Sequence, residues 1–159
     1  MRGRVLFVCE AVTLAHIARP LALAHESRER LDIMFAADPS VHDLVIRENW
    51  EVESITSVQP KEFMRRLRWG ECVFRAQELR DSVCEDLAVI RNMRPDVVVG
   101  DFRLSLSISC RLANIPYIAL GNAYWHPDAN LSVTVPELPL TKIVGVALGQ
   151  WIFDRLAPS

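Results

Sequence analysis

Short apolar segments of strand length recur along the chain, and they constrain its fold more than any other feature. The first, Val5–Cys9, is apolar at every position. A strand of this kind is buried on both faces, which is typical of a parallel sheet covered by helices. The segments expected to form strands are residues 5–9, 31–37, 52–55, 96–100 and 115–120.

Helical patterns lie between these strands. Pro20 suits the first turn of a helix, where its fixed φ and missing N–H are tolerated. Ser40 is expected to be the N-cap of a short helix over residues 41–48. The other helices are expected to begin at Pro60, with a break at Gly70, and to cover residues 73–91, 104–112 and 140–156.

The alternation of strand and helix predicts the fold class. Right-handed crossovers place helices on both faces of a parallel sheet, so we expect a doubly wound, Rossmann-like α/β fold. Half of the residues are apolar and 24% are charged, which suits a globular domain with a sizeable core. No linker or repeat divides the sequence, and we therefore expect residues 1–159 to form a single domain.

Composition and charge pattern exclude several classes of protein. The formal net charge of −2 gives no sign of nucleic-acid binding. The longest segment without charged residues, 112–127, is interrupted by proline, glycine and asparagine, so no membrane span is expected. Glu10 and His16 interrupt the apolar run that would form a signal peptide. The cysteines form no CxxC pair, and we interpret them as reduced core thiols of a cytoplasmic protein.

The carboxyl ends of the first and fourth strands are where we expect the chemistry. Ligand crevices of doubly wound sheets open there, at the point where the winding reverses. His16 follows the first strand and Asp101 follows the fourth. An Asp that holds one ring N–H of a His allows the other nitrogen to act as a general base, and a helix N-terminus nearby favours the neutral ring. The alternative is that both residues only pack or cap a helix.

Motifs of other α/β enzymes are missing from the sequence. No glycine lies between Cys9 and Pro20, so the first loop lacks the Rossmann dinucleotide fingerprint. The sequence also has no Walker loop, no GxSxG elbow and no Cys/His spacing typical of a metal site. A nicotinamide dehydrogenase is therefore not expected, nor is a resident cofactor or metal.

A family resemblance is carried by three segments: RVLFVCEAVTLAHIARPLALAHE, DIMFAAD and PDVVVGDFRLSLSISCRLANIPYIALGNA. In their order and spacing they resemble the N-terminal half of UDP-glycosyltransferases of the GT-B fold, which glycosylate small molecules. The resemblance covers nearly the whole chain. It implies an inverting, metal-independent reaction in which His16 deprotonates the acceptor hydroxyl and Asp101 orients His16. Both residues are therefore the expected catalytic pair.

The resemblance also implies which partners the chain needs. GT-B enzymes have a second Rossmann-like domain that binds the nucleotide sugar, and we expect that domain to be absent from this chain. The co-substrate would be a nucleotide sugar of the UDP-sugar type, and the acceptor a hydrophobic small molecule. We expect the isolated chain to be inactive and to self-associate through exposed apolar surface.

Further residues are candidates for binding the acceptor. Trp125 and His126, in the loop after the fifth strand, would line a pocket for an apolar acceptor or pack against the final helix. The basic amphipathic segment 61–69 is a solvated helix face, a surface for a membrane or partner, or part of the acceptor pocket. The complete set of candidates is Thr13, Trp69, Phe74, Asn122, Trp125 and His126.

Two other functions stay open at this point. The chain is alternatively a non-catalytic, Rossmann-like binding module, or the acceptor subunit of a two-chain glycosyltransferase. The geometry of His16 and Asp101 distinguishes an enzyme from a binding module. An imidazole and a carboxylate within about 3.2 Å of each other and open to a cleft favour the enzyme, whereas a buried or outward-facing His16 favours the binding module.

Overall fold

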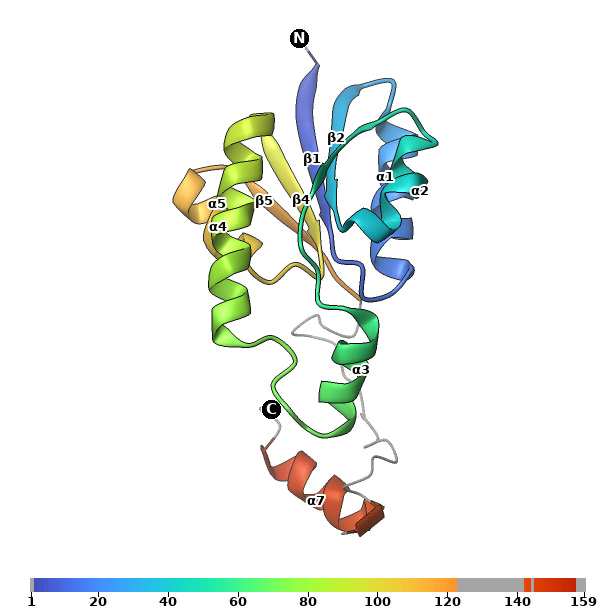
Figure 1. The fold of residues 1–159 in the computed structure, drawn as a ribbon, viewed down its shortest axis with the longest axis vertical. Helices are drawn as coiled ribbons and strands as arrows, with labels where there is room; N and C mark the ends of the chain where they lie inside the picture. Colours follow the sequence, from blue (N-terminus) through green and yellow to red (C-terminus); the bar gives the residue numbers. More distant parts are fainter. Residues whose placement is uncertain (1, 123–141, 144, 157–159) are drawn as a thin grey trace. The chain divides into compact units, whose positions relative to one another are not determined.

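The computed structural model describes residues 2–122, 142–143 and 145–156 of the chain (Figure 1). It divides into two compact units, one of residues 1–60 with 74–121 and the other of residues 61–73 with 122–159. Nothing in the sequence pattern indicates this division, and the single domain expected over residues 1–159 remains a prediction.

The first unit is built on a parallel sheet with the strand order β3-β2-β1-β4-β5. The winding reverses at β1, which has β2 on one side and β4 on the other. This arrangement confirms the doubly wound α/β fold. The strands are β1 (Gly3–Cys9), β2 (Leu31–Ala37), β3 (Glu51–Ser54), β4 (Val97–Asp101) and β5 (Tyr117–Leu120).

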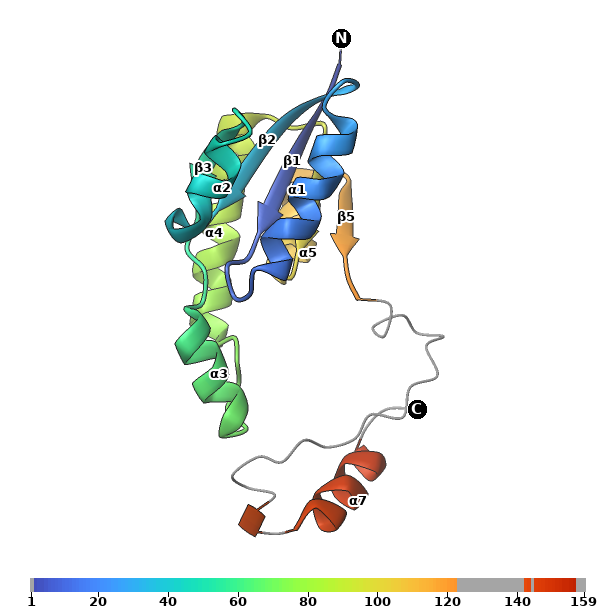
Figure 2. The same ribbon diagram turned by 90° about the vertical axis from the view of Figure 1, so that its right-hand side faces the viewer.

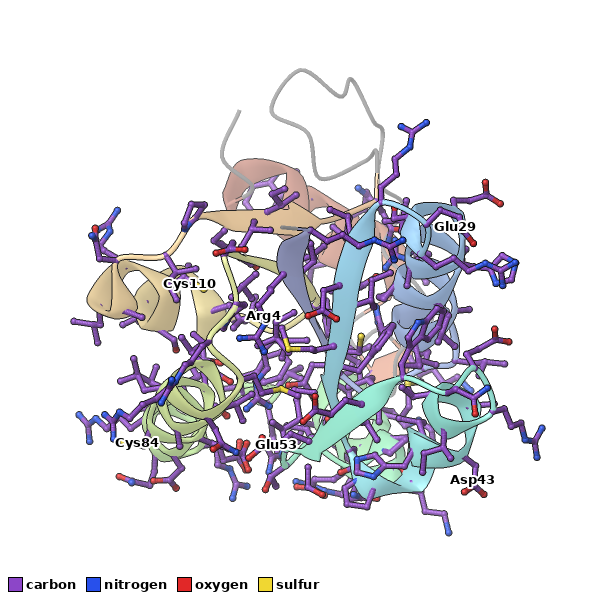
Figure 3. The ribbon with its side chains drawn as sticks, turned by 90° about the horizontal axis from the view of Figure 1, so that it is seen from above. Arg4, Glu29, Asp43, Glu53, Cys84 and Cys110 are labelled. Atoms are coloured by element: carbon purple, nitrogen blue, oxygen red, sulfur yellow. The ribbon has the colours of Figure 1, made fainter. Side chains whose placement is uncertain are left out.

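Helices cover both faces of this sheet, as Figure 2 shows. The helices of the first unit are α1 (Ala15–Ser27), α2 (His42–Ile46), α4 (Ala76–Met93) and α5 (Leu106–Ala113), with a 3₁₀ turn at Pro39–Val41. Seen from above in Figure 3, α4 and α5, which carry Cys84 and Cys110, lie on the opposite side of the strands from α1 and α2. The described helices of the other unit are α3 (Pro60–Arg68) and α7 (Val146–Leu156).

Alternate residues of the strands point to opposite faces, so the sheet has a core on each side. On the side of α4 and α5 the strands contribute Leu6, Val8, Met34, Ala36 and Val98. On the side of α1 and α2 they contribute Val5, Phe7, Cys9, Ile33, Phe35, Ala37 and Val99. Burial of both faces explains why the central strands are continuous apolar runs in the sequence.

Two helix starts differ from the sequence-based expectation. Helix α1 begins at Ala15 and contains Pro20, so His16 lies in its first turn and does not precede it. Helix α2 begins at His42, because Ser40 does not cap it. The Ser40 amide and hydroxyl instead donate to Asp38 Oδ1 at 3.0 and 2.6 Å, which stabilises the 3₁₀ turn.

The cysteines divide into two groups. Cys9 and Cys110 are buried, and burial raises the pKa of both thiols, that of Cys110 to about 11. Cys72 and Cys84 are exposed. The interpretation of the cysteines as core thiols is therefore wrong for two of them. Among the described residues, no helix has the length and apolar character needed to cross a membrane.

Gly100 provides a test of how closely β4 is packed. A Cβ atom at this position would clash with the Leu106 side chain and lie 3.0 Å from Tyr117 Cε2. We expect Gly100→Ala to lower the free energy of unfolding by about 1–3 kcal/mol, because a packed core resists an added carbon. Urea denaturation measures this change. Gly121→Ala is the control, since a Cβ there meets no atom within 4 Å; equal stability of the two variants would contradict the prediction.

Candidate active site

The sheet brings His16 and Asp101 together. Asp101 is the last residue of β4 and pairs in register with Cys9 at the end of β1. His16, in the first turn of α1, has its Nδ1 atom 2.8 Å from Asp101 Oδ1, although the two residues are 85 positions apart in the sequence. The Asp101 side chain is fully buried and that of His16 is 12% exposed. The distance is within the 3.2 Å that favours an enzyme, while the second condition, an opening of the pair to a cleft, stays a prediction.

The Asp101 carboxylate also determines how the imidazole can act. A carboxylate accepts hydrogen bonds, so it favours the tautomer that carries the proton on Nδ1 and leaves the Nε2 lone pair available. Asp101 Oδ1 accepts a second hydrogen bond, from Arg19 Nη2, at 2.8 Å. Arg19 lies one turn after His16 on α1, so the same helix supplies two groups that contact the carboxylate. Arg19 Nη2 also lies 3.2 Å from His16 Nδ1.

Phe102 holds the imidazole from another side. Its ring stacks on His16 with 4.6 Å between centroids and an angle of 7° between planes. The Phe102 backbone has a φ of +61°, in the left-handed region that bulky residues seldom adopt. Backbone strain of this kind is found at functional sites, where the surrounding structure enforces it. Here it follows directly after β4 and accompanies the placement of an aromatic ring over His16.

Arg103 forms the centre of a buried cluster of charges in the loop between β4 and α5. Its guanidinium donates to Glu10 Oε1 at 2.9 Å, to Glu85 Oε2 at 2.8 Å and to Asp86 Oδ1 at 3.0 Å. It also donates to the backbone carbonyl of Thr56 at 2.6 Å. One side chain, 1% exposed, therefore connects the ends of β1 and β3 to α4.

Burial favours the neutral form of both Glu10 and Arg103, but only Arg103 has neighbouring charges that outweigh this effect on its pKa. Burial raises the pKa of Glu10, and the attraction of Arg103 offsets only part of that rise. Burial opposes the charge of Arg103, but Asp86 and Glu10 outweigh it, so the pKa of Arg103 is raised. The guanidinium consequently stays charged, whereas the neutral form of Glu10 is favoured more than in an exposed carboxyl group.

A pocket of about 320 Å³ lies against this cluster, and we call it the Arg103 pocket. His16 is outside its lining, but one chain of ring contacts connects the two. The Phe74 ring lies 5.7 Å from that of Phe102, which in turn stacks on His16. The lining of the Arg103 pocket includes Glu10, Ser57, Phe74, Glu85, Arg103 and Ser105.

The PGL/p-HBAD biosynthesis rhamnosyltransferase of Mycobacterium tuberculosis is 41% identical over 158 residues, which are 99% of this chain and 35% of the relative. A PGL/p-HBAD biosynthesis glycosyltransferase of the same species is 41% identical over 146 residues, 91% of this chain and 34% of the relative. An inactive PGL/p-HBAD biosynthesis glycosyltransferase of Mycobacterium bovis matches equally well over the same length, 40% of that protein. No family model matches the chain.

Solved structures extend the comparison to the fold. The glycotransferase of kitacinnamycin superposes with a TM-score of 0.61 at 23% identity, covering 74% of this chain and 30% of that one. The spinosyn rhamnosyltransferase SpnG, complexed with thymidine diphosphate, gives a TM-score of 0.59 at 19% identity and covers 80% and 37%. This chain is similar in sequence to glycosyltransferases, and its α/β fold matches part of these solved glycosyltransferase structures. It spans between 34% and 40% of the length of the curated relatives described above.

The other candidate residues of this glycosyltransferase-related chain are scattered. Phe74 lines the Arg103 pocket, whereas Thr13 is exposed in the turn before α1. Trp69, which is 60% exposed, and Asn122 belong to the other unit. Trp125 and His126 lie outside the described residues. In residues 2–122, 142–143 and 145–156, no group of three or more His, Cys, Asp or Glu side chains is arranged to hold a metal ion.

Two arginines of the basic segment 61–69 are paired with carboxylates of their own unit. Arg65 and Arg66 contact Glu62 at 2.8 Å, and Arg65 also pairs with Glu71. Hydrogen bonds from both arginines lower the pKa of Glu62 to about 2. Because carboxylates already occupy these guanidinium groups, the pairing favours a solvated helix face over a basic surface for a membrane.

Sequence reasoning missed the Arg103 cluster. Two signals were available: Glu10 is a charged residue directly after an apolar strand, and Arg103 stands two positions after Asp101. Glu85 and Asp86 gave a weaker signal, because acidic pairs are common on exposed helix faces. What the sequence does not contain is the information that all four side chains meet at one point.

Arg103 is expected to contribute strongly to the stability of this unit. Arg103→Met leaves the buried carboxylates without their cation, so we expect a loss of about 3–5 kcal/mol in the free energy of unfolding at pH 7. Burial already raises the pKa of Glu10, and removal of Arg103 raises it further. The folded variant therefore takes up a proton more readily than the unfolded one, and its deficit shrinks as the pH falls towards 5. Urea denaturation at both pH values tests this, with the exposed Arg111→Met as control.

Proposed function

We propose that this chain is the acceptor-binding part of an inverting, metal-independent glycosyltransferase in which His16 is the general base. The observation that supports this proposal most directly is the 2.8 Å contact between His16 Nδ1 and the buried Asp101 carboxylate. It is the arrangement that a hydroxyl-activating base requires, with one ring nitrogen held and the other available. The glycosyltransferase names of the sequence relatives support the same reaction class.

The proposed reaction is a single displacement. His16 Nε2 takes the proton of an acceptor hydroxyl while the hydroxyl oxygen forms a bond to the anomeric carbon of a nucleotide sugar. The bond between that carbon and the diphosphate oxygen breaks, and the nucleoside diphosphate leaves with the electron pair. Attack from the face opposite the leaving group inverts the anomeric centre. Asp101 stabilises the imidazolium that forms, and Phe102 keeps the ring in position.

The nucleotide sugar is proposed to bind mainly outside the residues that the structure describes. The Arg103 pocket is lined by four carboxylates, Glu10, Glu78, Asp81 and Glu85, against the single guanidinium of Arg103. A diphosphate would be repelled by such a lining. The first loop, residues 10–14, has no glycine to let the backbone approach a phosphate. A UDP-sugar therefore has no obvious site among the described residues.

A non-catalytic binding module is the second candidate function. The observation that favours it is the relative from Mycobacterium bovis that is named inactive and is as similar to this chain as the others. An acceptor subunit of a two-chain enzyme differs from our main proposal only in how the donor-binding part is supplied. Activity measurements on variants of His16 distinguish the catalytic from the non-catalytic candidate.

Self-association through apolar surface remains a prediction. Ile108 and Leu112 lie four residues apart on α5, Leu104 lies in the loop just before this helix, and all three are exposed by 46% or more. Apolar residues gathered in this way are a source of association between protein molecules.

The catalytic pair can be tested in a chimera in which this chain replaces the matching residues of the Mycobacterium tuberculosis rhamnosyltransferase. With the relative's own donor and acceptor, we expect His16→Ala to lower kcat by about 10²-fold or more. Asp101→Asn should be nearly as damaging, and the double variant should cost little more, because the two residues act as one unit. His25→Ala, an exposed histidine on the same helix, is the matched control. Losses that multiply, or wild-type turnover in His16→Ala, would contradict the proposed roles.

The isolated chain should bind the donor weakly and transfer no sugar. The reason is the acidic pocket and the glycine-free first loop described above. Calorimetric titration with UDP-glucose and a transfer assay on the 159-residue chain measure both properties. Micromolar donor binding, or turnover without any added protein, would show that the proposed division of substrates between two parts is wrong.

A further inference from the structure

We infer that Arg19 is a positioning residue that balances the charge of Asp101 and thereby keeps His16 in its neutral, proton-accepting form. The inference rests on the proposed function, because it takes His16 as the general base. Arg19 is assigned no contact with the acceptor or the sugar. It acts on the reaction only through the carboxylate and the imidazole that it contacts on its own helix and on β4.

The Asp101 carboxylate is held through one of its two oxygens. Oδ1 accepts hydrogen bonds from His16 Nδ1 and from Arg19 Nη2, both at 2.8 Å. Oδ2 is buried and has no hydrogen-bond partner among the described residues. The side chain has no exposed surface, and burial disfavours a carboxylate that lacks compensating groups. The two donors at Oδ1 therefore decide how the charge of Asp101 is compensated.

This buried carboxylate contacts one permanent cation, Arg19, in the described part of the chain. The neighbouring strands supply Cys9 from β1 and Tyr117 from β5. Burial, and to a smaller extent nearby negative charge, raises the pKa of both groups, that of Tyr117 to about 12, so both are neutral at pH 7. The Glu10 carboxylate, which follows β1, is paired with Arg103.

The charges at this site balance only when Arg19 is present. One guanidinium then compensates one carboxylate, and the site is neutral while His16 carries a single proton. Without the guanidinium, the site would have a net negative charge until His16 took up a second proton. An uncompensated buried charge is strongly disfavoured, so the imidazole would become the imidazolium that replaces the missing cation.

The position of Arg19 also opposes the imidazolium directly. Its Nη2 atom lies 3.2 Å from His16 Nδ1, and two positive charges at this separation repel each other. His16 is in the first turn of α1, where the partial positive charge of the helix N-terminus acts in the same direction. A general base works only in its unprotonated form. Arg19 therefore makes His16 a weaker base that is available at lower pH.

The charge state of His16 can be measured without an activity assay. The ¹⁵N chemical shifts of an imidazole distinguish the ring with one proton from the imidazolium, and His16→Ala assigns the signals. In the 159-residue chain at pH 7, we expect Arg19→Met to raise the imidazolium fraction of His16 at least about threefold. Arg19→Gln, which keeps a hydrogen-bond donor without a charge, should do the same and covers the case in which the methionine variant does not fold.

Arg19→Lys is the variant that keeps the charge. A single nitrogen of Arg19 contacts Asp101, so an ammonium group can take its place. We expect the imidazolium fraction in Arg19→Lys to match that of the unchanged chain. Arg28→Met is the matched control, since Arg28 is exposed at the other end of α1 and its only ion pair in the described residues, with Glu29, is 3.9 Å long.

The pH profile of sugar transfer in the chimera described above distinguishes a charge effect from a structural one. We expect Arg19→Gln to lower kcat/KM at least about tenfold at pH 6 but less than about threefold at pH 9, where His16 is neutral without help from Arg19. A residue that only held the structure together would lower the rate equally at every pH. Arg19→Lys and Arg28→Met should keep the profile of the unchanged chimera.

The outcomes separate this inference from the proposed function. An unchanged imidazolium fraction in both Arg19→Met and Arg19→Gln, an equal rise in Arg28→Met, or equal losses of kcat/KM at pH 6 and pH 9 would each overturn it. Behaviour of Arg19→Lys like that of Arg19→Gln would also overturn it, because the charge would then not be the property that matters. Wild-type turnover in His16→Ala would contradict the proposed base and leave the NMR result as measured.

Discussion

The buried guanidinium of Arg103 is the interaction on which the carboxyl edge of the sheet depends. It contacts Glu10 after β1, the Thr56 carbonyl after β3, and Glu85 and Asp86 on α4. These segments are far apart in the sequence, and without a shared cation their buried carboxylates would repel one another. The first unit therefore has a buried ion-pair cluster at the carboxyl edge of the sheet, where parallel sheets bind ligands. It also has an apolar core on each side of the strands.

Asp101 and Arg103, at the end of β4, contact helices on opposite faces of the sheet. Asp101, the last strand residue, contacts His16 and Arg19 on α1, whereas Arg103 reaches α4 on the other side of the sheet. Phe102 lies between them in a left-handed conformation. Three consecutive residues that reach alternate sides of the sheet thus connect the His16 imidazole to the Arg103 pocket, because the Phe102 ring contacts both His16 and Phe74. The geometry gives a physical reason for the strain at Phe102.

The positions of some residues at the carboxyl edge of the sheet were predictable from the sequence. Strand-length apolar runs and the reversal of winding were sufficient to predict that His16 and Asp101 would meet, because the first and fourth strands of a doubly wound sheet are neighbours. The start of α1 was not predictable from Pro20, since a proline close to a helix start is accommodated in more than one position. Ser40 was misassigned for a related reason: its hydroxyl can donate to Asp38 or cap a helix, and local sequence does not decide between them.

The sequence by itself determined the layered α/β architecture and the pairing of His16 with Asp101, because hydrophobic periodicity fixes which residues are buried and strand order follows from the handedness of crossovers. Only the tertiary structure decided that Glu10, Glu85, Asp86 and Arg103 form one cluster, and that a pocket lies against it. These contacts join loops and a helix face, where no periodic pattern exists. A charged residue has the same appearance in a sequence whether it faces water or a buried partner of opposite charge.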